Sequence, residues 1–452
     1  MRYRIKISEK DFLKIRAHFK NNFPKEAAVF ILTGMATFDD QTDILVRRAI
    51  QIEESDFDIQ EMYQLRIAPR AINGLMALCE AGNVGAGFCH SHPDNIPYSY
   101  ADTFGENRLS ETARNFCPDG MPFTSILFYP NGVVGARVWI EGEDGPIDVD
   151  EIVIVGRSIR KIFFSGEKSE ESTDPNMFSR QILALGEDGQ AAIESTKIGI
   201  VGTGGTGSAC AEQLVRLGVR DFVLLDGDPL DKSNVTRVYG SFPFDEKKSP
   251  MKVEVVRDHL LHINPEALVK IIPRYIQEDN AALDLRDRDV IFLCTDDHWG
   301  RAVVNQVSFQ YLIPTINMGV RIDSKNNRIA AGVATVDVLR PDSACLWCKK
   351  ALDPDRIAAE AMPPAERSAR GSYVQGLDTK APMVIPFTTM AASMAMSHFL
   401  QLITDYLGED GDGESQRYFI IENEISHGKT PISPDPCICK KCKAKGDLMR
   451  II

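Results

Sequence analysis

Residues 197–208, with the sequence KIGIVGTGGTGS, constrain the fold of this chain more than any other stretch. An apolar run ends there in a cluster of glycines, and a helical pattern follows as far as Leu217. The next apolar run ends in Asp226-Gly227-Asp228. This order of strand, glycine turn, helix, strand and acid predicts a nucleotide site. N–H groups at the helix N-terminus would face a phosphate, and Asp226 or Asp228 would take a ribose hydroxyl.

Each glycine of the cluster has a physical use. Gly202 permits a sharp turn, Gly204 lets the backbone approach the ligand, and Gly207 lets the helix pack closely on the strand. Gly205 belongs to the same predicted binding loop. Taken alone, the pattern favours NAD or FAD, the usual ligands of such a loop. The residues beyond Asp228 are therefore needed to identify the nucleotide.

Composition narrows the class of protein. A chain of 452 residues predicts two or three domains at roughly 100–200 residues per domain. The formal net charge of −13 argues against a general nucleic-acid or anionic-membrane binder. The start, MRYRIKISEKDF, lacks the apolar core of a signal peptide, and no window reaches the roughly 18 apolar residues of a membrane span. A cytoplasmic location without nucleic-acid or membrane partners is therefore expected.

A polar, acidic segment at 166–176 (GEKSEESTDPN) predicts a linker between two α/β domains, residues 1–165 and 177–452. The second domain alternates strands and helices, as in a doubly wound sheet. Its strands are expected at 197–201, 222–226, 268–272, 290–294 and 313–317, and its helices at 208–217, 250–262 and 388–406. In the first domain, helices are expected at 9–19 and 70–79, and strands at 27–32, 43–52, 84–89, 124–129 and 133–140.

The first domain carries a candidate metal site. His90 and His92 lie two apart on an extended segment, so both side chains point the same way. Together with Asp102 they offer the three N and O ligands that a catalytic zinc needs. Glu26, at the start of an apolar run, would take a proton from the metal's water, and Ser99 would hydrogen-bond a developing oxyanion.

These residues, in the order Glu, His-Ser-His-Pro, Ser-x-x-Asp, resemble the JAMM/JAB (MPN) metalloproteases over about the first 140 residues. The resemblance implies cleavage at the C-terminus of a ubiquitin-like protein. One spacing departs from the family, because six residues separate His92 from Ser99 where seven are usual. The alternatives are a metal-free fold that docks the modifier or a conjugating enzyme, or two unrelated surface histidines.

The second domain contains a longer ordered set of motifs. They are Phe178-Ser179-Arg180, the glycine loop, Asp226-Gly227-Asp228, Ser233-Asn234-Val235-Thr236-Arg237, Pro250-Met251-Lys252 and Thr295-Asp296. This set resembles the adenylation domain shared by ThiF/MoeB enzymes and ubiquitin-activating enzymes, over about 270 residues. The resemblance implies ATP and Mg²⁺ as cofactors and disfavours a redox dinucleotide.

The resemblance also assigns roles to single residues. Arg237 and Lys252 would contact the phosphates, with Asn234 helping to hold them. Asp226 would take the ribose, and Asp296 would hold magnesium. Arg180 matches an arginine that reaches into the ATP site of a partner subunit, which implies a homodimer.

Two C-x-x-C pairs, Cys345/Cys348 and Cys439/Cys442, suit a tetrahedral structural zinc. The same pairs occur in the family, and Cys437 is interpreted as a bystander. A redox role for either pair is the alternative. The remaining cysteines are isolated and read as buried thiols.

Many relatives pass the activated carboxylate to a cysteine before the last long helix, but residues 371–386 contain none. Cys210 and Cys294 fit core positions better. Either the reaction stops at the adenylate, or a partner supplies the thiol, or a substitution has removed it.

Together these patterns predict an enzyme that adenylates the C-terminal glycine of a ubiquitin-like protein and carries a zinc isopeptidase or processing domain. By resemblance alone, it would act with a conjugating enzyme in a bacterial ubiquitin-like pathway, with phage defence as one role. The alternatives are activation of a sulfur-carrier protein, or an activating enzyme whose first domain only docks its partner.

Overall fold

The computed structural model describes residues 1–164, 174–245, 249–278, 280–363, 381–408, 413–434 and 437–451. The chain divides into two compact units. The first comprises Met1–Lys168, Gln310–Leu312 and Cys442–Arg450, and the second comprises Ser169–Phe309, Ile313–Lys441 and Ile451–Ile452. Most of the predicted linker lies outside the described residues. The expected single domain at 177–452 differs from the structure at its end, because Cys442–Arg450 belongs to the first unit.

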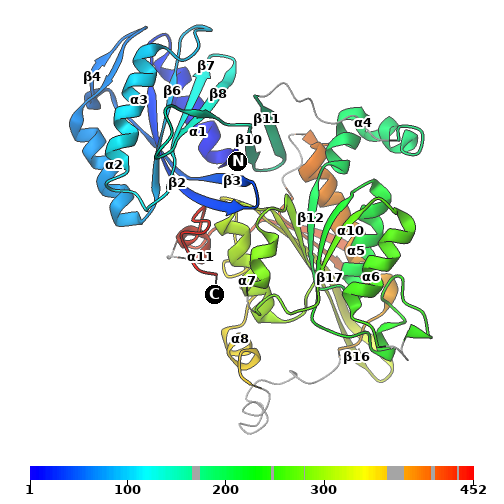
Figure 1. The fold of residues 1–452 in the computed structure, drawn as a ribbon. Helices are drawn as coiled ribbons and strands as arrows, with labels where there is room; N and C mark the ends of the chain where they lie inside the picture. Colours follow the sequence, from blue (N-terminus) through cyan, green and yellow to red (C-terminus); the bar gives the residue numbers. More distant parts are fainter. Residues whose placement is uncertain are drawn as a thin grey trace. The chain divides into compact units, whose positions relative to one another are not determined.

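A mixed sheet forms the frame of the first unit (Figure 1). Its strands are β1 (Arg2–Ser8), β2 (Ala28–Phe38), β3 (Gln41–Gln51), β6 (Gly85–Ser91), β7 (Phe123–Tyr129), β8 (Gly132–Trp139), β9 (Ile147–Asp148), β10 (Glu151–Val155) and β11 (Ile159–Phe163). Their order is β11-β10-β1-β3-β2-β6-β7-β8-β9. A separate short pair joins β4 (Phe57–Gln60) to β5 (Leu65–Ile67). The five strands predicted here are confirmed, with ends shifted by up to six residues.

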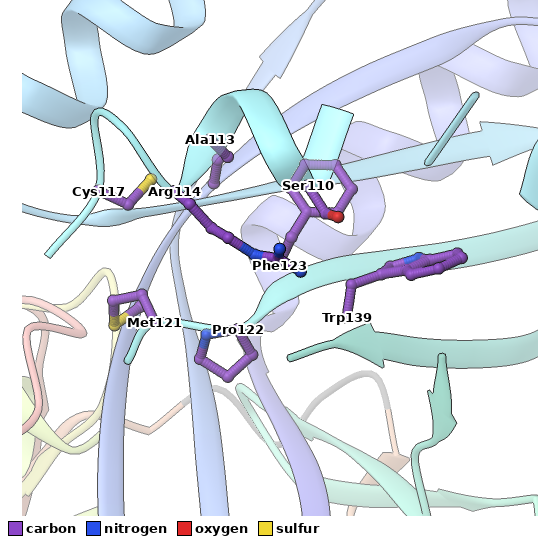
Figure 2. A pocket seen from close by; sticks show the side chains of 9 residues that line it. Ser110, Ala113, Arg114, Cys117, Met121, Pro122, Phe123 and Trp139 are labelled. Atoms are coloured by element: carbon purple, nitrogen blue, oxygen red, sulfur yellow. The ribbon is translucent and has the colours of Figure 1, made fainter. Parts of the chain in front are cut away.

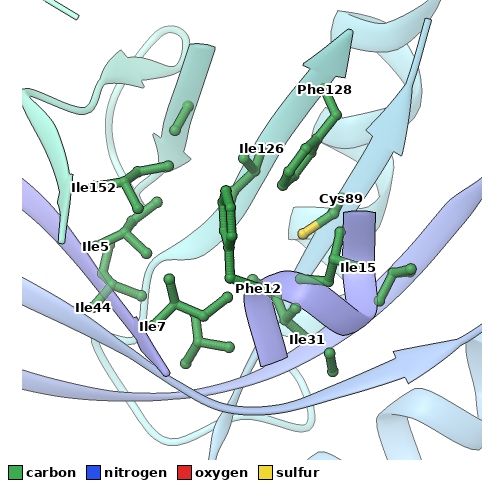
Figure 3. Close-up of a cluster of buried hydrophobic side chains, with 14 of the residues drawn as sticks. Ile5, Ile7, Phe12, Ile15, Ile31, Ile44, Cys89, Ile126, Phe128 and Ile152 are labelled. Atoms are coloured by element: carbon green, nitrogen blue, oxygen red, sulfur yellow. The ribbon is translucent and has the colours of Figure 1, made fainter. Parts of the chain in front are cut away.

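Helices cover both faces of this sheet. Helix α1 (Glu9–Asn22) packs on one face, where Phe12 and Ile15 meet Ile5, Ile31 and their neighbours (Figure 3). Helices α2 (Pro69–Gly82) and α3 (Tyr100–Ala113) lie on the other face, over a second buried cluster. Strand residues alternate between the two clusters because successive side chains of a strand point to opposite faces.

The segment Cys442–Arg450, called the strap here, completes the first unit. Gly446 bridges to Met35 of β2, and the Asp447 N–H donates to the Met35 carbonyl at 2.7 Å. The ammonium of Lys443 donates to Asp11 at 2.8 Å, where both side chains are largely buried. The strap is therefore fixed to β2 and α1 by backbone pairing and by a shielded ion pair.

We expect Gly34→Ala in β2 to loosen the strap, because its methyl group would lie 2.1 Å from the Ala444 carbonyl oxygen. Overpacking of this kind lowers the free energy of unfolding by about 1–3 kcal/mol. Gly74→Ala in α2 is the matched control, since nothing lies within 4 Å of its added methyl. Thermal unfolding and tryptic cleavage within 440–450 measure both effects. Equal unfolding temperatures and cleavage rates for the two variants would show that the strap does not pack as described.

The second unit is built on an eight-stranded sheet. Its strands are β12 (Lys197–Val201), β13 (Asp221–Leu225), β14 (Leu268–Ile272), β15 (Val290–Leu293), β16 (Thr315–Lys325), β17 (Arg328–Leu339), β18 (Ser415–Phe419) and β19 (Glu424–Gly428). The order is β14-β13-β12-β15-β16-β17-β18-β19, parallel from β14 to β16 and antiparallel beyond. Strand order reverses between β12 and β15, and such a switch point is where doubly wound sheets bind ligands.

Helices flank this sheet. They are α4 (Ser179–Glu194), α5 (Gly205–Leu217), α6 (Lys252–Ile263), α7 (His298–Gln310), α8 (Pro354–Glu360), α10 (Ile385–Thr404) and the short α11 (Ile438–Lys441). The predicted doubly wound fold is confirmed, although α5 begins three residues earlier than expected, directly on the glycine loop. No helix among the described residues is long and apolar enough to cross a membrane.

Candidate functional sites

The glycine loop turns from β12 into α5 with no room for side chains beneath it. Gly202 has a φ of +88°, and a methyl group there would lie 2.7 Å from the Thr295 amide nitrogen. A methyl on Gly207 would lie 1.9 Å from the Gly202 carbonyl oxygen. At Gly204, the N-cap of α5, nothing lies within 4 Å of an added methyl. The loop is therefore packed against the protein at Gly202 and Gly207 and open at Gly204, as backbone contact with a phosphate requires.

Asp226 holds this loop from the end of β13. One carboxylate oxygen accepts the Thr203 N–H at 2.7 Å and the Thr203 hydroxyl at 3.2 Å. The other accepts the Asp228 N–H at 2.9 Å. Burial raises the pKa of the Asp226 carboxyl, and Lys252 opposes this rise. The Asp226 carboxylate, predicted to accept a ribose hydroxyl, thus already accepts three hydrogen bonds from the protein itself.

Asp228 is more accessible, with 45% of its side chain exposed. Its carboxylate accepts hydrogen bonds from the Lys252 ammonium at 2.7 Å and from the Tyr275 hydroxyl at 2.6 Å. Burial disfavours its ionisation, but these two donors outweigh burial and hold the pKa of Asp228 below its usual range. Tyr275 was not anticipated. Its ring packs on Gly227, where an added methyl would lie 2.8 Å from it.

A second cation faces the glycine loop. Arg237 follows the 3₁₀ turn η2 (Lys232–Asn234) and donates to the Asn234 side-chain oxygen at 2.8 Å and to the Ser233 carbonyl at 2.7 Å. An added methyl on Gly205 would lie 3.2 Å from the Arg237 side chain. Asn234 thus orients Arg237 against the N-terminus of α5.

The other two predicted residues of this site are exposed. Asp296 lies just beyond β15, at the switch point between β12 and β15. Arg180 lies in the first turn of α4. The structure brings Asp226, Asp228 and Lys252 together by direct hydrogen bonds, and Asn234 with Arg237 by another. Within the described part of the chain, neither Asp296 nor Arg180 forms a hydrogen bond or salt bridge with these residues, so their roles stay predictions.

In the first unit, the structure gathers the three predicted metal ligands. Ligand atoms of His90, His92 and Asp102 all lie within 4.8 Å of one another. Asp102 Oδ1 is 3.6 Å from His90 Nε2, and its Oδ2 is 3.5 Å from His92 Nε2. Both histidines are buried, and Asp102 keeps 19% of its side chain exposed. Two nitrogens and one carboxylate oxygen thus converge on one partly open point, the donor set of a catalytic zinc.

The histidines are prepared to donate lone pairs. The Nδ1 of His92 lies 2.7 Å from the Ile96 carbonyl, which fixes a proton there, and its Nε2 faces Asp102. Neither ring nitrogen of His90 has a hydrogen-bond partner among the described residues. Burial lowers the pKa of His90 to about 3, against the pull of Asp102, and so keeps this ring neutral. A buried, neutral, unpartnered imidazole fits a metal ligand.

Glu26 and Ser99 border this group. Glu26 Oε1 is 4.0 Å from His92 Nε2. Burial raises the pKa of Glu26 to about 7 although His92 opposes the rise, so this carboxylate can accept and return a proton near neutrality. Ser99 is exposed and caps α3, where its hydroxyl accepts the Asp102 N–H at 3.1 Å. The Ser99 side chain and backbone both hydrogen-bond the Asp102 carboxylate and help to hold the pKa of that carboxyl below its usual range.

Four cysteines of the second unit also cluster, and they differ from the predicted set. The sulfurs of Cys345, Cys348, Cys437 and Cys439 lie within 4.8 Å of one another. The sulfur of Cys345 lies 3.3 Å from that of Cys437 and 3.7 Å from that of Cys348, and the Cys348 sulfur lies 3.7 Å from Cys437 and 3.9 Å from Cys439. Four sulfurs bound to zinc at about 2.3 Å in a tetrahedron lie about 3.8 Å apart. The group therefore fits a structural zinc and is too open for disulfides.

The expected roles of Cys437 and Cys442 are thus exchanged. Cys437 directly precedes α11, and its sulfur lies 3.3 Å from that of Cys345. Cys442 begins the strap and belongs to the first unit. The C-x-C pair Cys437/Cys439 supplies two of the four clustered sulfurs, whereas the prediction relied on the C-x-x-C spacing of Cys439 and Cys442.

We expect Cys437→Ser to lose the metal of this cluster and Cys442→Ser to keep it. The first change removes one of four converging sulfurs, whereas the second removes a buried thiol of the other unit. Zinc content after dialysis against a weak chelator, with thermal unfolding alongside, distinguishes them. Retention by Cys437→Ser together with loss by Cys442→Ser would restore the original assignment.

A small surface pocket lies on the first unit between α3 and β8 (Figure 2). Trp139, Arg114 and Cys117 are among its lining residues. None of the predicted metal ligands lines it. We therefore assign it no role in either site.

Comparison with known proteins bears on the second unit. The model of the ThiF family matches residues 178–436, more than half of the chain. A molybdopterin-synthase adenylyltransferase of Escherichia coli is 31% identical over 151 residues, which are 32% of this chain and 60% of that enzyme. A ubiquitin-like modifier-activating enzyme 5 of Caenorhabditis briggsae is 30% identical over 152 residues, 30% of this chain and 34% of that protein.

Solved structures give a weaker match. The crystal structure of E. coli MccB with ATP aligns over 59% of this chain and 75% of that chain, at 20% identity and a TM-score of 0.46. The chain spans less than two thirds of the length of the two curated relatives above. The match to the family model begins at residue 178, and the first unit lies before it apart from the strap and Gln310–Leu312.

Proposed function

The chain belongs to the ThiF family, and from this we propose that it uses ATP to adenylate the C-terminal carboxylate of a ubiquitin-like or sulfur-carrier protein. The observation that carries the proposal is the placement of two cations, Lys252 and Arg237, beside an open glycine loop. Both are held by hydrogen bonds before any ligand arrives. Such preorganised charge is what a reaction at a triphosphate needs.

The reaction joins a carboxylate oxygen to the α-phosphorus of ATP and breaks the bond from that phosphorus to the bridging oxygen, which leaves with pyrophosphate. Negative charge grows on the leaving phosphates. Lys252 and Arg237 would neutralise it, and the N–H groups at the start of α5 would hold the phosphate oxygens. Asp296 would hold Mg²⁺, which neutralises charge and aligns the leaving group when bound.

The fate of the adenylate is part of the proposal. Residues 371–380 of the segment that lacks a cysteine lie outside the described residues. We propose that the acceptor thiol comes from a conjugating enzyme. We also propose that the chain described here is a cytoplasmic homodimer, in which Arg180 of one subunit reaches the ATP site of the other. Phage defence is proposed as its role on the family resemblance alone. Transfer of sulfur to the adenylate is the alternative within the same chemistry.

Pyrophosphate exchange into ATP tests the adenylation. The purified chain is mixed with ATP, labelled pyrophosphate and a ubiquitin-like protein. Label should enter ATP only when the modifier ends in its free terminal glycine. Mass measurement of the modifier then separates an adenylate from a thiocarboxylate. Exchange that proceeds equally without the modifier would refute the proposed substrate.

We further propose that the first unit is a zinc-dependent peptidase or isopeptidase that acts at the C-terminus of such a modifier. What supports this is the convergence of His90, His92 and Asp102 beside Glu26, whose pKa lies near neutrality. Zinc, when bound by these three residues, supplies Lewis acidity to a carbonyl and acidifies water. Glu26 would accept a proton from the attacking water and return it to the leaving amine, and Ser99 would donate to the carbonyl oxygen.

Metal content decides between this peptidase and a docking module. The full chain should bind one zinc through the four cysteines and a second through the first unit. The variant His90→Ala should lose only the second zinc. A wild-type chain that holds zinc only at its cysteines would favour the docking role.

A further inference from the structure

A buried polar network lies behind the candidate metal site in the first unit. Arg137 of β8 donates through Nε to Glu106 at 2.7 Å. Glu106 also accepts hydrogen bonds from the Ser125 hydroxyl at 2.6 Å and from the Trp139 indole at 2.9 Å. Arg137 is 6% exposed and Glu106 is 1% exposed. Ionised groups buried this deeply are expensive, so they call for an explanation beyond stability.

The network reaches α3, the helix that carries the candidate ligand Asp102. Glu106 lies four residues after Asp102 on α3, so their side chains leave the same face of the helix. The ion pair from Glu106 to Arg137 thus ties the ligand-bearing turn of α3 to β8. Asp102 itself pairs with His90 and His92, and the ion pair of Glu106 adds a link from the same helix to β8.

Arg137 also holds the loop between His92 and α3. Its guanidinium carbon lies 3.7 Å from the centre of the Tyr98 ring, a close cation–π contact. The Tyr98 hydroxyl donates to the Gly135 carbonyl at 3.4 Å, and a methyl on Gly135 would lie 3.3 Å from the Tyr98 ring. The opposite contact of Tyr98 is the His90 ring, 5.9 Å away between centres. Tyr98 is therefore wedged between β8 and a metal ligand.

This arrangement explains how a short loop can serve the site. Six residues separate His92 from Ser99, and Tyr98 is the last of them. With the ring fixed on Arg137, the chain enters the Ser99 cap at a defined point. The Ser99 N–H then donates to Asp102 at 2.6 Å. Loop, cap and carboxylate are positioned as one body.

We propose that Arg137 is a positioning residue for the metal site, acting through Tyr98 on the loop and through Glu106 on Asp102. The proposal rests on the proposed metal site in the first unit. Partners of metal ligands commonly change metal affinity by about 10–100-fold when they are replaced. Lysine cannot reproduce the arginine fork or its stacking on an aromatic ring, so Arg137→Lys keeps the charge and loses the positioning.

Cobalt binding by the full chain tests this. The Cys345→Ser/Cys437→Ser background removes the cysteine site, so that the cobalt absorption spectrum reports only the first unit. We expect Arg137→Lys to weaken cobalt binding about 10-fold or more and to change its visible absorption band. Tyr98→Leu should weaken cobalt binding in the same way. Tyr98→Phe keeps an aromatic ring on Arg137 and should therefore show the wild-type spectrum.

Arg4→Lys is the matched control. Arg4 is also buried and pairs with a carboxylate, Asp43, at 2.7 Å, with 8% and 1% of the two side chains exposed. We expect it to lower the unfolding temperature of the metal-free chain about as much as Arg137→Lys while leaving cobalt affinity unchanged. Equal affinity and spectra for Arg137→Lys and wild type would overturn the positioning role alone. A wild-type chain that binds no cobalt would overturn the metal site itself, and the positioning role with it.

Discussion

Replacing Lys252 by methionine should slow modifier-dependent pyrophosphate exchange by about 100-fold or more. Loss of one preorganised donor to transition-state charge typically costs 10²–10³-fold, and here the lost donor is a full cation. Methionine keeps much of the length and apolar character of the lysine stem, so the change removes charge more than volume. The substitution also releases Asp228 from a hydrogen bond of 2.7 Å. Initial rates at saturating and subsaturating ATP separate binding from chemistry.

Lys270→Met is the control for this experiment. Lys270 lies on β14 and also donates to a carboxylate at 2.7 Å, that of Asp284, but 62% of its side chain is exposed. A surface pair of this kind contributes little, about 0–1 kcal/mol. Exchange by Lys270→Met should therefore match wild type. If Lys252→Met exchanges as fast as Lys270→Met while both remain folded, the assigned phosphate site is wrong.

Much of the nucleotide site could be predicted from local sequence. Gly202 and Gly207 stand where backbone geometry excludes any side chain, so their pattern is imposed by a single turn. Asp226 and Lys252 lie at predictable ends of a strand and a helix. Tyr275 escaped prediction because its contact with Asp228 depends on how β14 lies beside β13, which no short motif records.

The metal site was predictable for a similar reason. His90 lies on β6, His92 follows one residue after the end of that strand, and Asp102 lies in the first turn of α3, so one strand end and one helix start fix most of the geometry. Glu26 reaches the group because Ala28 pairs with His90 across β2 and β6. That strand pairing depends on the whole sheet. From the sequence, only the order of Glu26, the two histidines and Asp102 along the chain suggested that Glu26 belongs to the site. Arg137 was missed altogether, since a lone arginine in an alternating strand carries no signal of what it will pack against.

The end of the chain shows where pattern reading fails. Cys437 and Cys442 both stand three or fewer residues from Cys439, and spacing alone favours Cys442 as a ligand. In the structure, the pairing of Gly446 with Met35 and the ion pair of Lys443 with Asp11 hold residues 442–450 in the first unit. Spacing along the chain carries no sign of such long-range contacts, so it could not show that Cys442 begins the strap.

The largest expected effect in the first unit is that of Glu26→Gln, which should reduce cleavage of a C-terminally extended modifier by about 10²–10⁴-fold. The amide retains the size and part of the hydrogen bonding of the carboxylate, but it cannot accept a proton. Burial, which raises the pKa of Glu26 to about 7, marks this carboxyl as the group able to exchange a proton at neutral pH. Its oxygen lies 4.0 Å from His92 Nε2, beside the three ligand atoms and outside their group. Zinc content should therefore remain that of wild type.

His90→Ala supplies the contrast, because it removes one of the converging nitrogens and should lose both zinc and cleavage. The two variants separate proton transfer from metal binding: one is inactive with metal, and the other is inactive without it. Cleavage is followed by the mass of the shortened modifier in the presence of the full chain. Wild-type cleavage by Glu26→Gln would remove Glu26 from the mechanism, and loss of zinc in that variant would make it a ligand. Either result would require a different base, and Ser99, whose hydroxyl already accepts the Asp102 N–H, is poorly suited to be one.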